Sequence, residues 1–225
     1  MQLQAVICPP QGAIDGALQI THGIFAPEPA PVVEEPKRGL LGRIKKPPPP
    51  TEMAPEVIWE PTPPAAMFVR VCKFGSVTLT DTRALVKSFQ QVAPDWPRPM
   101  LHVGSVYISE TEPFAVHARL EGDTDELFTV FRNVLDVAKE HDFFLDRRSF
   151  RSQVSLGTVR VPPGADVPEG LPGAVIPLEG PEWQATHLTL LRLTLVGDAL
   201  SYEEVATIPI GHEAEQAAAP TRRQA

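Results

Sequence analysis

The stretch Arg148-Ser-Phe-Arg-Ser-Gln-Val-Ser-Leu-Gly-Thr-Val-Arg160 predicts a β-strand with arginines at its start. Side chains two positions apart on a strand point to the same face, so Gln153 and Ser155 share one face. Arg148 and Arg151 lie just before this pair. Hydroxyl, amide and guanidinium groups all donate hydrogen bonds, and a guanidinium suits phosphate in particular. The stretch therefore places several hydrogen-bond donors on and just before one face of the predicted strand.

An earlier strand, from Met67 to Phe74, carries Phe68 and Arg70 with the same spacing, and a helix from 81 to 93 follows it. Asp123 and Glu126 are spaced as a variant of the capping box and predict the start of a longer helix. The strand of the opening stretch is expected at 152–161, further strands at 1–8, 101–108, 114–121, 186–195 and 202–210, and a further helix at 12–21. This order of helices, hairpins and crossovers predicts an α+β fold with two lobes of largely antiparallel sheet around a central cleft.

Proline is concentrated in one part of the chain. Twelve of the 26 prolines fall between residues 25 and 66, where a packed helix or strand is disfavoured. We expect residues 25–66 to be a disordered Pro-rich insertion, residues 1–24 and 67–211 to form the domain, and 212–225 to be a disordered tail. Five positive charges lie in the basic segment 37–46, and residues 37–50 could bind a protein partner.

The composition excludes several classes of protein. A net charge of −8 over 225 residues argues against a general nucleic-acid coater. No apolar run approaches the roughly 18 residues of a transmembrane helix, which predicts a cytoplasmic protein. Cys8 and Cys72 cannot form a disulfide scaffold or a metal site by themselves and are expected to be buried thiols. No metal and no cofactor is expected.

The order of elements and the local patterns resemble the 2H phosphoesterase superfamily, and within it the 2′-5′ RNA ligase-like (LigT-type) RNA 2′,3′-cyclic phosphodiesterases. The stretch from Arg148 to Arg160 is similar to the second motif region of this family, Arg-x-Phe-x-Pro-His-x-Thr-Leu-(Gly/Ala)-Arg. The stretch from Phe68 to Gly75 lies where the first motif, His-x-Thr-Leu-x-Phe-x-Gly, is expected. The segment 183–211 resembles the closing strand pair of the family.

The resemblance implies a phosphodiesterase site in which one histidine acts as general base and the other as general acid. Here the first motif reads Phe68-x-Arg70 and the second reads Gln153-x-Ser155. Neither phenylalanine nor glutamine can exchange a proton at neutral pH, so the general acid–base contribution of roughly 10²–10⁴ per group is expected to be lost. The interpretation is a catalytically degenerate protein, a pseudoenzyme. It would bind a phosphate-bearing ligand, such as an RNA end or a cyclic nucleotide, through six residues: Phe68, Arg70, Arg148, Arg151, Gln153 and Ser155.

Other interpretations stay open. Phe68 could fill the cleft while Arg70 pairs with a carboxylate. An active cyclic phosphodiesterase could instead use a non-standard pair, His102 and His187, with Thr189 holding phosphate, since His187-Leu-Thr189 matches the motif literally. The chain could also be a non-catalytic scaffold that acts through the insertion. His117 is expected on a solvated face.

Overall fold

The computed structural model describes residues 2–25, 57–143, 145, 150–197 and 199–212. The elements in chain order are β1 (Gln2–Ile7), α1 (Gln11–Phe25), β2 (Ile58–Pro61), a 3₁₀ helix (Pro64–Ala66), β3 (Val69–Ser76), α2 (Leu79–Val92), a second 3₁₀ helix (Ala93–Asp95), β4 (Met100–Ile108), β5 (Phe114–Gly122), α3 (Thr124–Glu140), β6 (Gln153–Arg160), β7 (Val175–Pro177), β8 (Trp183–Gln184), β9 (His187–Val196) and β10 (Ala199–Pro209).

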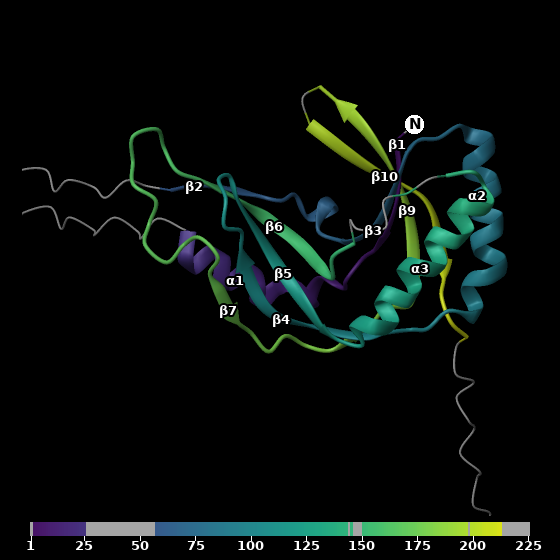
Figure 1. Cartoon of the computed structure of the whole chain (residues 1–225), viewed down its shortest axis with the longest axis horizontal. Helices are drawn as coiled ribbons and strands as arrows, with labels where there is room; N and C mark the ends of the chain where they lie inside the picture. The colour runs from purple at the N-terminus through teal and green to yellow at the C-terminus, as the bar shows by residue number, and fades with distance from the viewer. Residues whose placement is uncertain (1, 26–56, 144, 146–149, 198, 213–225) are drawn as a thin grey trace, which may run out of the picture.

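One antiparallel sheet of ten strands runs through the molecule in the order β10-β9-β1-β3-β6-β5-β4-β7, with β2 paired to β6 and β8 paired to β4. The strands β10, β9, β1 and β3 form one lobe, and β6, β5, β4 and β7 form the other (Figure 1). Between the lobes, β3 and β6 pair at a single position, Val69 opposite Val154. The predicted two-lobed α+β fold is therefore confirmed, with the two sheets joined into one.

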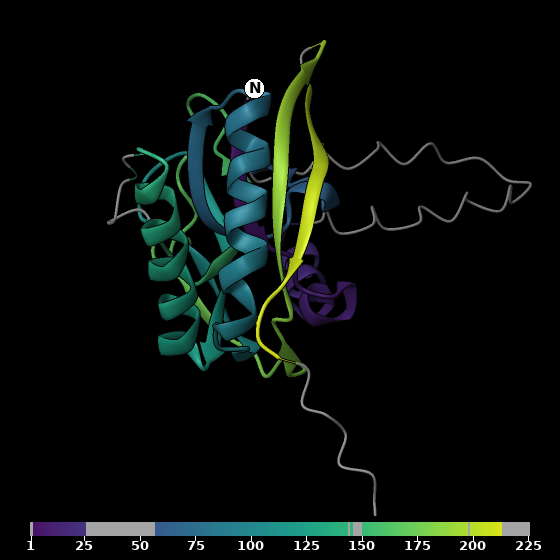
Figure 2. The same cartoon turned by 90° about the vertical axis from the view of Figure 1, so that its right-hand side faces the viewer.

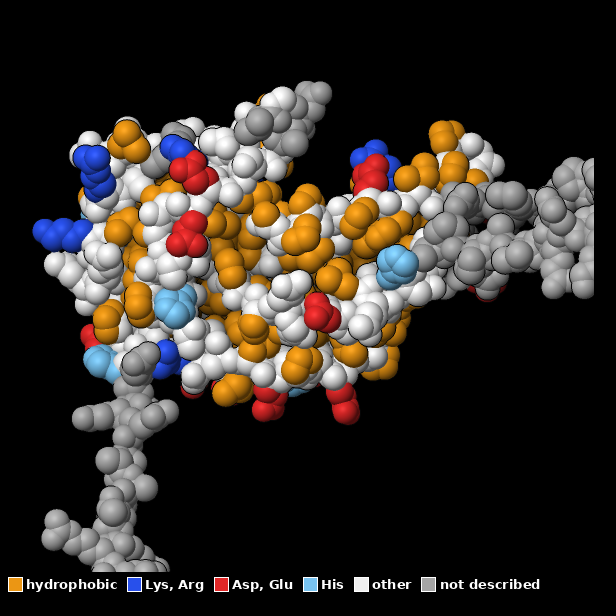
Figure 3. Space-filling model, turned by 180° about the vertical axis from the view of Figure 1, so that it is seen from behind, with side chains coloured by type: hydrophobic (Ala, Val, Ile, Leu, Met, Phe, Trp, Pro, Cys, Tyr) orange, Lys and Arg blue, Asp and Glu red, His pale blue; other side chains and the backbone are white. Residues whose placement is uncertain are grey.

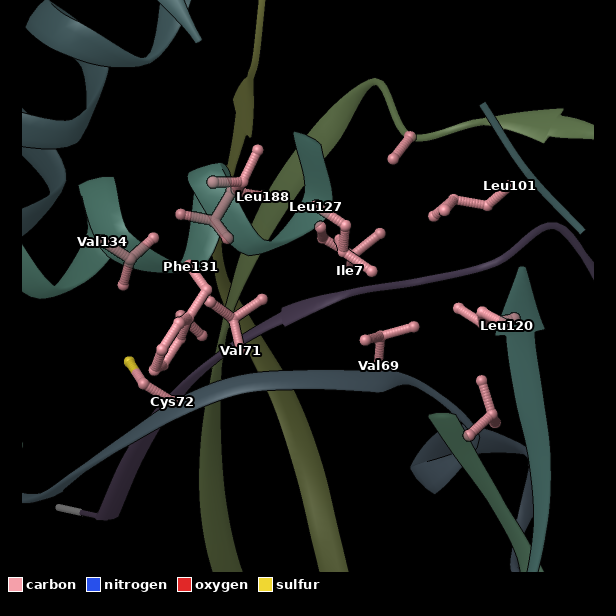
Figure 4. Packing of buried hydrophobic residues seen from close by; sticks show 14 of the residues in the cluster. Ile7, Val69, Val71, Cys72, Leu101, Leu120, Leu127, Phe131, Val134 and Leu188 are labelled. Atoms are coloured by element: carbon pink, nitrogen blue, oxygen red, sulfur yellow. The ribbon is translucent and has the colours of Figure 1, made fainter. Parts of the chain in front are cut away.

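The helices cover the sheet on the side away from the pocket described below. Helices α2 and α3 lie side by side against the lobe that contains β3, while α1 packs against β4 of the other lobe (Figures 1 and 2). Figure 4 shows the packing under α3, where Phe131 and Val134 lie over Val71 and Cys72. Ile7 and Val69 are paired across β1 and β3 and face this same core.

The helix starts differ from expectation in one respect. Helix α2 begins after Thr78, whose hydroxyl accepts a hydrogen bond from the Asp81 amide at 3.1 Å. At α3, however, the Asp123 side chain caps nothing. Its carboxylate instead accepts a hydrogen bond from the amide of Met100 at 3.0 Å, which ties the helix start to β4. The predicted capping box is therefore wrong, although the helix is present.

The boundary of the insertion also differs from the one expected. Residues 58–66 form β2 and a 3₁₀ helix, and β2 pairs with β6 from Ile58 opposite Arg160 to Pro61 opposite Gly157. The ring of Trp59 stacks on Phe25 at 5.1 Å between centroids, which joins this strand to the end of α1. The basic segment 37–46, the rest of 26–56 and the tail from 213 lie outside the described residues.

Figure 3 shows one face of the molecule, with hydrophobic side chains spread over its middle and few charged ones among them. In the part of the chain that the structure describes, no helix combines the length and the apolar character needed to cross a membrane.

Candidate functional site

A small pocket lies where the two lobes meet. Its volume is about 120 Å³, and it is lined by residues from the start of β3, from β5 and from the start of β6: Ala66, Phe68, Arg70, His117, Arg151, Gln153 and Ser155. Five of the six ligand-binding residues expected from the sequence line this one pocket, and the sixth, Arg148, lies outside the described residues. The stretches that begin β3 and β6 are thus brought together, at the β3–β6 junction.

The β3 side of the pocket combines a buried ring with an exposed charge. Phe68 is only 5 % exposed and packs in a small cluster with Val6 and Leu191, where Tyr202 meets it edge to face at 5.5 Å between ring centroids. Arg70 follows two positions later, is exposed, and has its Cζ atom 6.0 Å from the Phe68 ring centroid. Among the described residues Arg70 forms no ion pair, so its guanidinium is not neutralised by a carboxylate.

The β6 side supplies polar groups. Gln153 and Ser155 stand on the same face of the strand, as the i and i+2 spacing predicts. The Ser155 hydroxyl lies 3.2 Å from the Thr62 hydroxyl, so one of them donates to the other and the Ser155 side chain is held in place. Arg151, just before β6, donates a hydrogen bond to the carbonyl oxygen of Phe150 at 2.7 Å.

Sequence reasoning missed one pocket residue, His117. It lies directly opposite Ser155 in the β5–β6 ladder and lines the pocket, whereas a solvated face had been expected. Its Nδ1 atom is buried without a hydrogen-bond partner in the described structure. Burial lowers the pKa of His117, and the charge of the neighbouring Arg119 lowers this pKa further, so the imidazole is neutral at pH 7. The alternation of His117 with Arg119 was visible in the sequence, but the partner strand was not.

The charge of the pocket suits an anion. Arg70 and Arg151 line it, and the lining residues that the structure describes include no carboxylate. Guanidinium groups, a hydroxyl and an amide can together donate several hydrogen bonds to phosphate oxygens. The described residues contain no group of three or more His, Cys, Asp and Glu side chains arranged to hold a metal ion.

The alternative histidine pair lies outside this pocket. His102 stands on β4 with Nε2 3.9 Å from a carboxylate oxygen of Glu121. His187 begins β9, and its Nδ1 lies 2.8 Å from the hydroxyl of Thr186. Thr189 is buried, with its hydroxyl 3.5 Å from that of Thr207. Each histidine has a partner of its own, and none of these three residues lines the pocket.

Comparison with known proteins finds the same architecture in solved structures. No protein-family model matches the chain, and no curated protein matches it by sequence. The structure of LigT from E. coli in its apo form superposes with a TM-score of 0.59 at 12 % identity, covering 94 % of this chain and 98 % of LigT. The chain has the LigT fold.

Two further solved structures are also similar to this chain. The protein TT0787 of Thermus thermophilus is 16 % identical with a TM-score of 0.56, covering 95 % of this chain and 100 % of its own. A structure described as a phosphoesterase is 12 % identical with a TM-score of 0.58, covering 94 % of this chain and 98 % of its own. LigT itself has also been solved in complexes with NADP+, 3'-AMP, phosphate and ATP. At these low identities the comparisons show a shared fold only.

Proposed function

We propose that the chain is a catalytically degenerate member of the 2H phosphoesterase superfamily that binds a phosphate-bearing ligand, such as an RNA end or a cyclic nucleotide, in the pocket at the β3–β6 junction. One observation carries the proposal. Arg70, Arg151, Gln153 and Ser155 come from two lobes and line one pocket, and none of the described residues that line it is a carboxylate. A pocket of this kind stabilises an anion through charge and through donated hydrogen bonds.

The degenerate chemistry follows from the residues at the two motif positions. Phe68 has no group that can carry a proton, and its ring is buried between Val6 and Leu191. Gln153 can donate and accept hydrogen bonds but does not titrate. A site that loses both a general acid and a general base loses roughly 10²–10⁴ in rate for each. The remaining groups support binding without efficient turnover.

The size of the pocket indicates which part of the ligand it receives. Pockets that enclose whole small molecules have volumes of roughly 300–1,000 Å³. With about 120 Å³, this pocket has room for a phosphate group, while a nucleoside attached to it would lie over the rim. The complexes of LigT with 3'-AMP, phosphate and ATP support a phosphate-bearing ligand for this fold.

The test measures binding and hydrolysis separately, with 2′,3′-cyclic AMP and with an RNA that ends in a 2′,3′-cyclic phosphate. We expect binding in isothermal titration calorimetry and no hydrolysis above background by chromatography. Arg70→Ala should weaken binding about tenfold or more, because a hydrogen bond to a charged group contributes roughly 1.5–3 kcal/mol. Arg83→Ala is the matched control, since Arg83 is an exposed arginine on α2 that lines no part of this pocket.

Two outcomes would contradict the proposal. If the wild type and Arg70→Ala bound these ligands with equal affinity, the ligands would not bind in this pocket. Hydrolysis well above background would rule out a degenerate site. If that hydrolysis were lost in His187→Ala and retained in Gln153→Ala, it would support the alternative pair of His102 and His187, which no contact in the described structure favours.

A further inference from the structure

Among the described residues that line the pocket, His117 is the one that can change its charge near neutral pH, since the other ionisable ones are Arg70 and Arg151. It is half-buried on β5, opposite Ser155. Its Nδ1 atom is buried without a partner, and within the described residues Nε2 has no hydrogen-bond partner either. The ring therefore lines the pocket without a protein group to fix its protonation state.

We propose that His117 takes up one proton when an anion occupies the pocket, and that it contacts the bound phosphate group as an imidazolium ion. The inference rests on the proposed function, because it requires the anion to bind in this pocket. The proton comes from solvent and returns to solvent when the ligand leaves, and no covalent bond is made or broken. Binding would therefore be coupled to pH by a residue that lies outside both motif positions.

The charged groups around His117 explain why the proton depends on the ligand. On its own strand Arg119 stands two positions away, with its Cζ 3.6 Å from the ring centroid of Tyr107 on β4. Arg70 approaches from β3 and Arg151 from the segment before β6, while the β6 residue opposite His117 is the uncharged Ser155. Among the lining residues that the structure describes there is no carboxylate. Partial burial of the imidazole and the positive charge of Arg119 thus disfavour a further positive charge on His117 in the absence of a ligand.

A bound anion reverses this balance. An opposite charge within about 4–6 Å favours the protonated form of an imidazole and raises its pKa by roughly 1–3 units. In the empty pocket the pKa of His117 is lowered by burial and by Arg119. Between the pKa of the free state and that of the bound state, the complex holds one more proton than the free protein. Affinity must therefore rise as pH falls through this window, by about tenfold for each unit between the two pKa values.

The test uses two probes whose own charge is constant between pH 5.5 and 8.5: inorganic sulfate and 2′,3′-cyclic AMP. Titration calorimetry in pairs of buffers with different ionisation enthalpies gives the number of protons taken up with each ligand. We expect a net uptake of up to one proton at pH values between the pKa of the free state and that of the bound state, and affinity about tenfold higher at pH 5.5 than at pH 8. His117→Gln keeps a side chain that forms hydrogen bonds but cannot be protonated, and it should abolish both effects while some binding remains.

His102→Gln is the matched control, because His102 stands on the neighbouring strand β4 and lines no part of the pocket. It should leave the proton uptake unchanged. Proton uptake that persists in His117→Gln, or pH-independent affinity in the wild type, overturns the inference and leaves the proposed function intact. The absence of any sulfate or 2′,3′-cyclic AMP binding across the pH range contradicts both. NMR titration of the His117 imidazole, with and without sulfate, tests the wild type directly: its pKa must rise on binding.

Discussion

At the scale of single residues, His117 couples the stability of the free protein to pH. Its pKa is lowered in the folded state by burial and by Arg119, whereas in the unfolded chain it returns to about 6.5. The unfolded state then binds more protons between the two values, so the free energy of unfolding must fall as pH drops below about 6.5. Urea unfolding at pH 5 to 8 should show this decline. His117→Gln should reduce it, whereas an identical decline in the variant would contradict the assignment.

The two thiols should react differently. Burial raises the pKa of Cys72 to about 12, and its side chain is 4 % exposed, so it is neither ionised nor accessible. Cys8 is exposed just after β1, and the expectation that both thiols are buried is wrong for it. At pH 8 the native protein should release one equivalent in a thiol assay with DTNB and a second only after unfolding. Cys8→Ser should remove the first equivalent, and a native protein with two reactive thiols would contradict the burial of Cys72.

The pocket residues that could be predicted from the sequence are those that stand at the motif positions or next to them. Phe68, Arg70, Gln153 and Ser155 stand at motif positions, and the structure places them around one pocket. His117 belongs to no motif, and only the pairing of β5 with β6 brings it to Ser155. That pairing joins two segments far apart in the sequence, and local periodicity carries no information on which strand will be the neighbour.

At the scale of elements, the approach of β2 to β6 depends on a glycine. A Cβ atom at Gly157 would lie 2.6 Å from the carbonyl oxygen of Glu60 and 2.7 Å from Cζ2 of Trp59. Because one of these is backbone, Gly157→Ala can be accommodated only if β2 moves. We expect a loss of about 1–3 kcal/mol in the free energy of unfolding, measured by urea denaturation.

The control for this substitution is also a glycine to alanine change. A Cβ at Gly23 in α1 meets nothing within 4 Å, and alanine favours a helix over glycine by roughly 0.5–1 kcal/mol. Gly23→Ala should therefore leave the stability unchanged or raise it. Equal stability of Gly157→Ala and the wild type would mean that β2 is not held against β6 as described.

Elements with a long apolar periodicity could be predicted from the sequence, and those held by tertiary contacts could not. Helix α3 has such a periodicity in its sequence, and Leu127, Phe131 and Val134 on its apolar face are buried in the core. Strand β2 is a short strand next to prolines and exists because it pairs with β6. A tertiary contact also explains the role of Asp123. Its carboxylate accepts a hydrogen bond from the backbone amide of Met100 on β4 and does not cap helix α3.

At the scale of the whole molecule, the negative net charge of the chain does not describe the charge around the pocket. The chain carries a net charge of −8, yet the described residues that line the pocket include Arg70 and Arg151 and no carboxylate. The net charge argued against broad binding of nucleic acid but gives no information on the local charge around a pocket. The basic segment 37–46 lies outside the described residues, so a partner for residues 37–50 stays a prediction.

The division between domain and insertion can be tested by two deletions. Replacing residues 27–55 with a short Gly/Ser linker keeps Trp59, which stacks on Phe25 at 5.1 Å, so the two ends to be joined already lie close together. If residues 27–55 are the disordered insertion expected from their prolines, shortening them changes the free energy of unfolding by only about 0.6 kcal/mol per halving of the length. We therefore expect a melting temperature within a few degrees of the wild type and unchanged binding of sulfate.

Replacing residues 27–64 in the same way should have a different effect. It removes β2, uncovers Phe25, which is 7 % exposed, and deletes Thr62, which holds the hydroxyl of Ser155 at the pocket. Burying an aromatic side chain contributes about 1.5–3 kcal/mol, so this variant should melt at a clearly lower temperature and bind sulfate more weakly. If both deletions behaved alike, β2 would belong to the insertion. If the shorter deletion alone abolished sulfate binding, residues 27–55 would take part in the site.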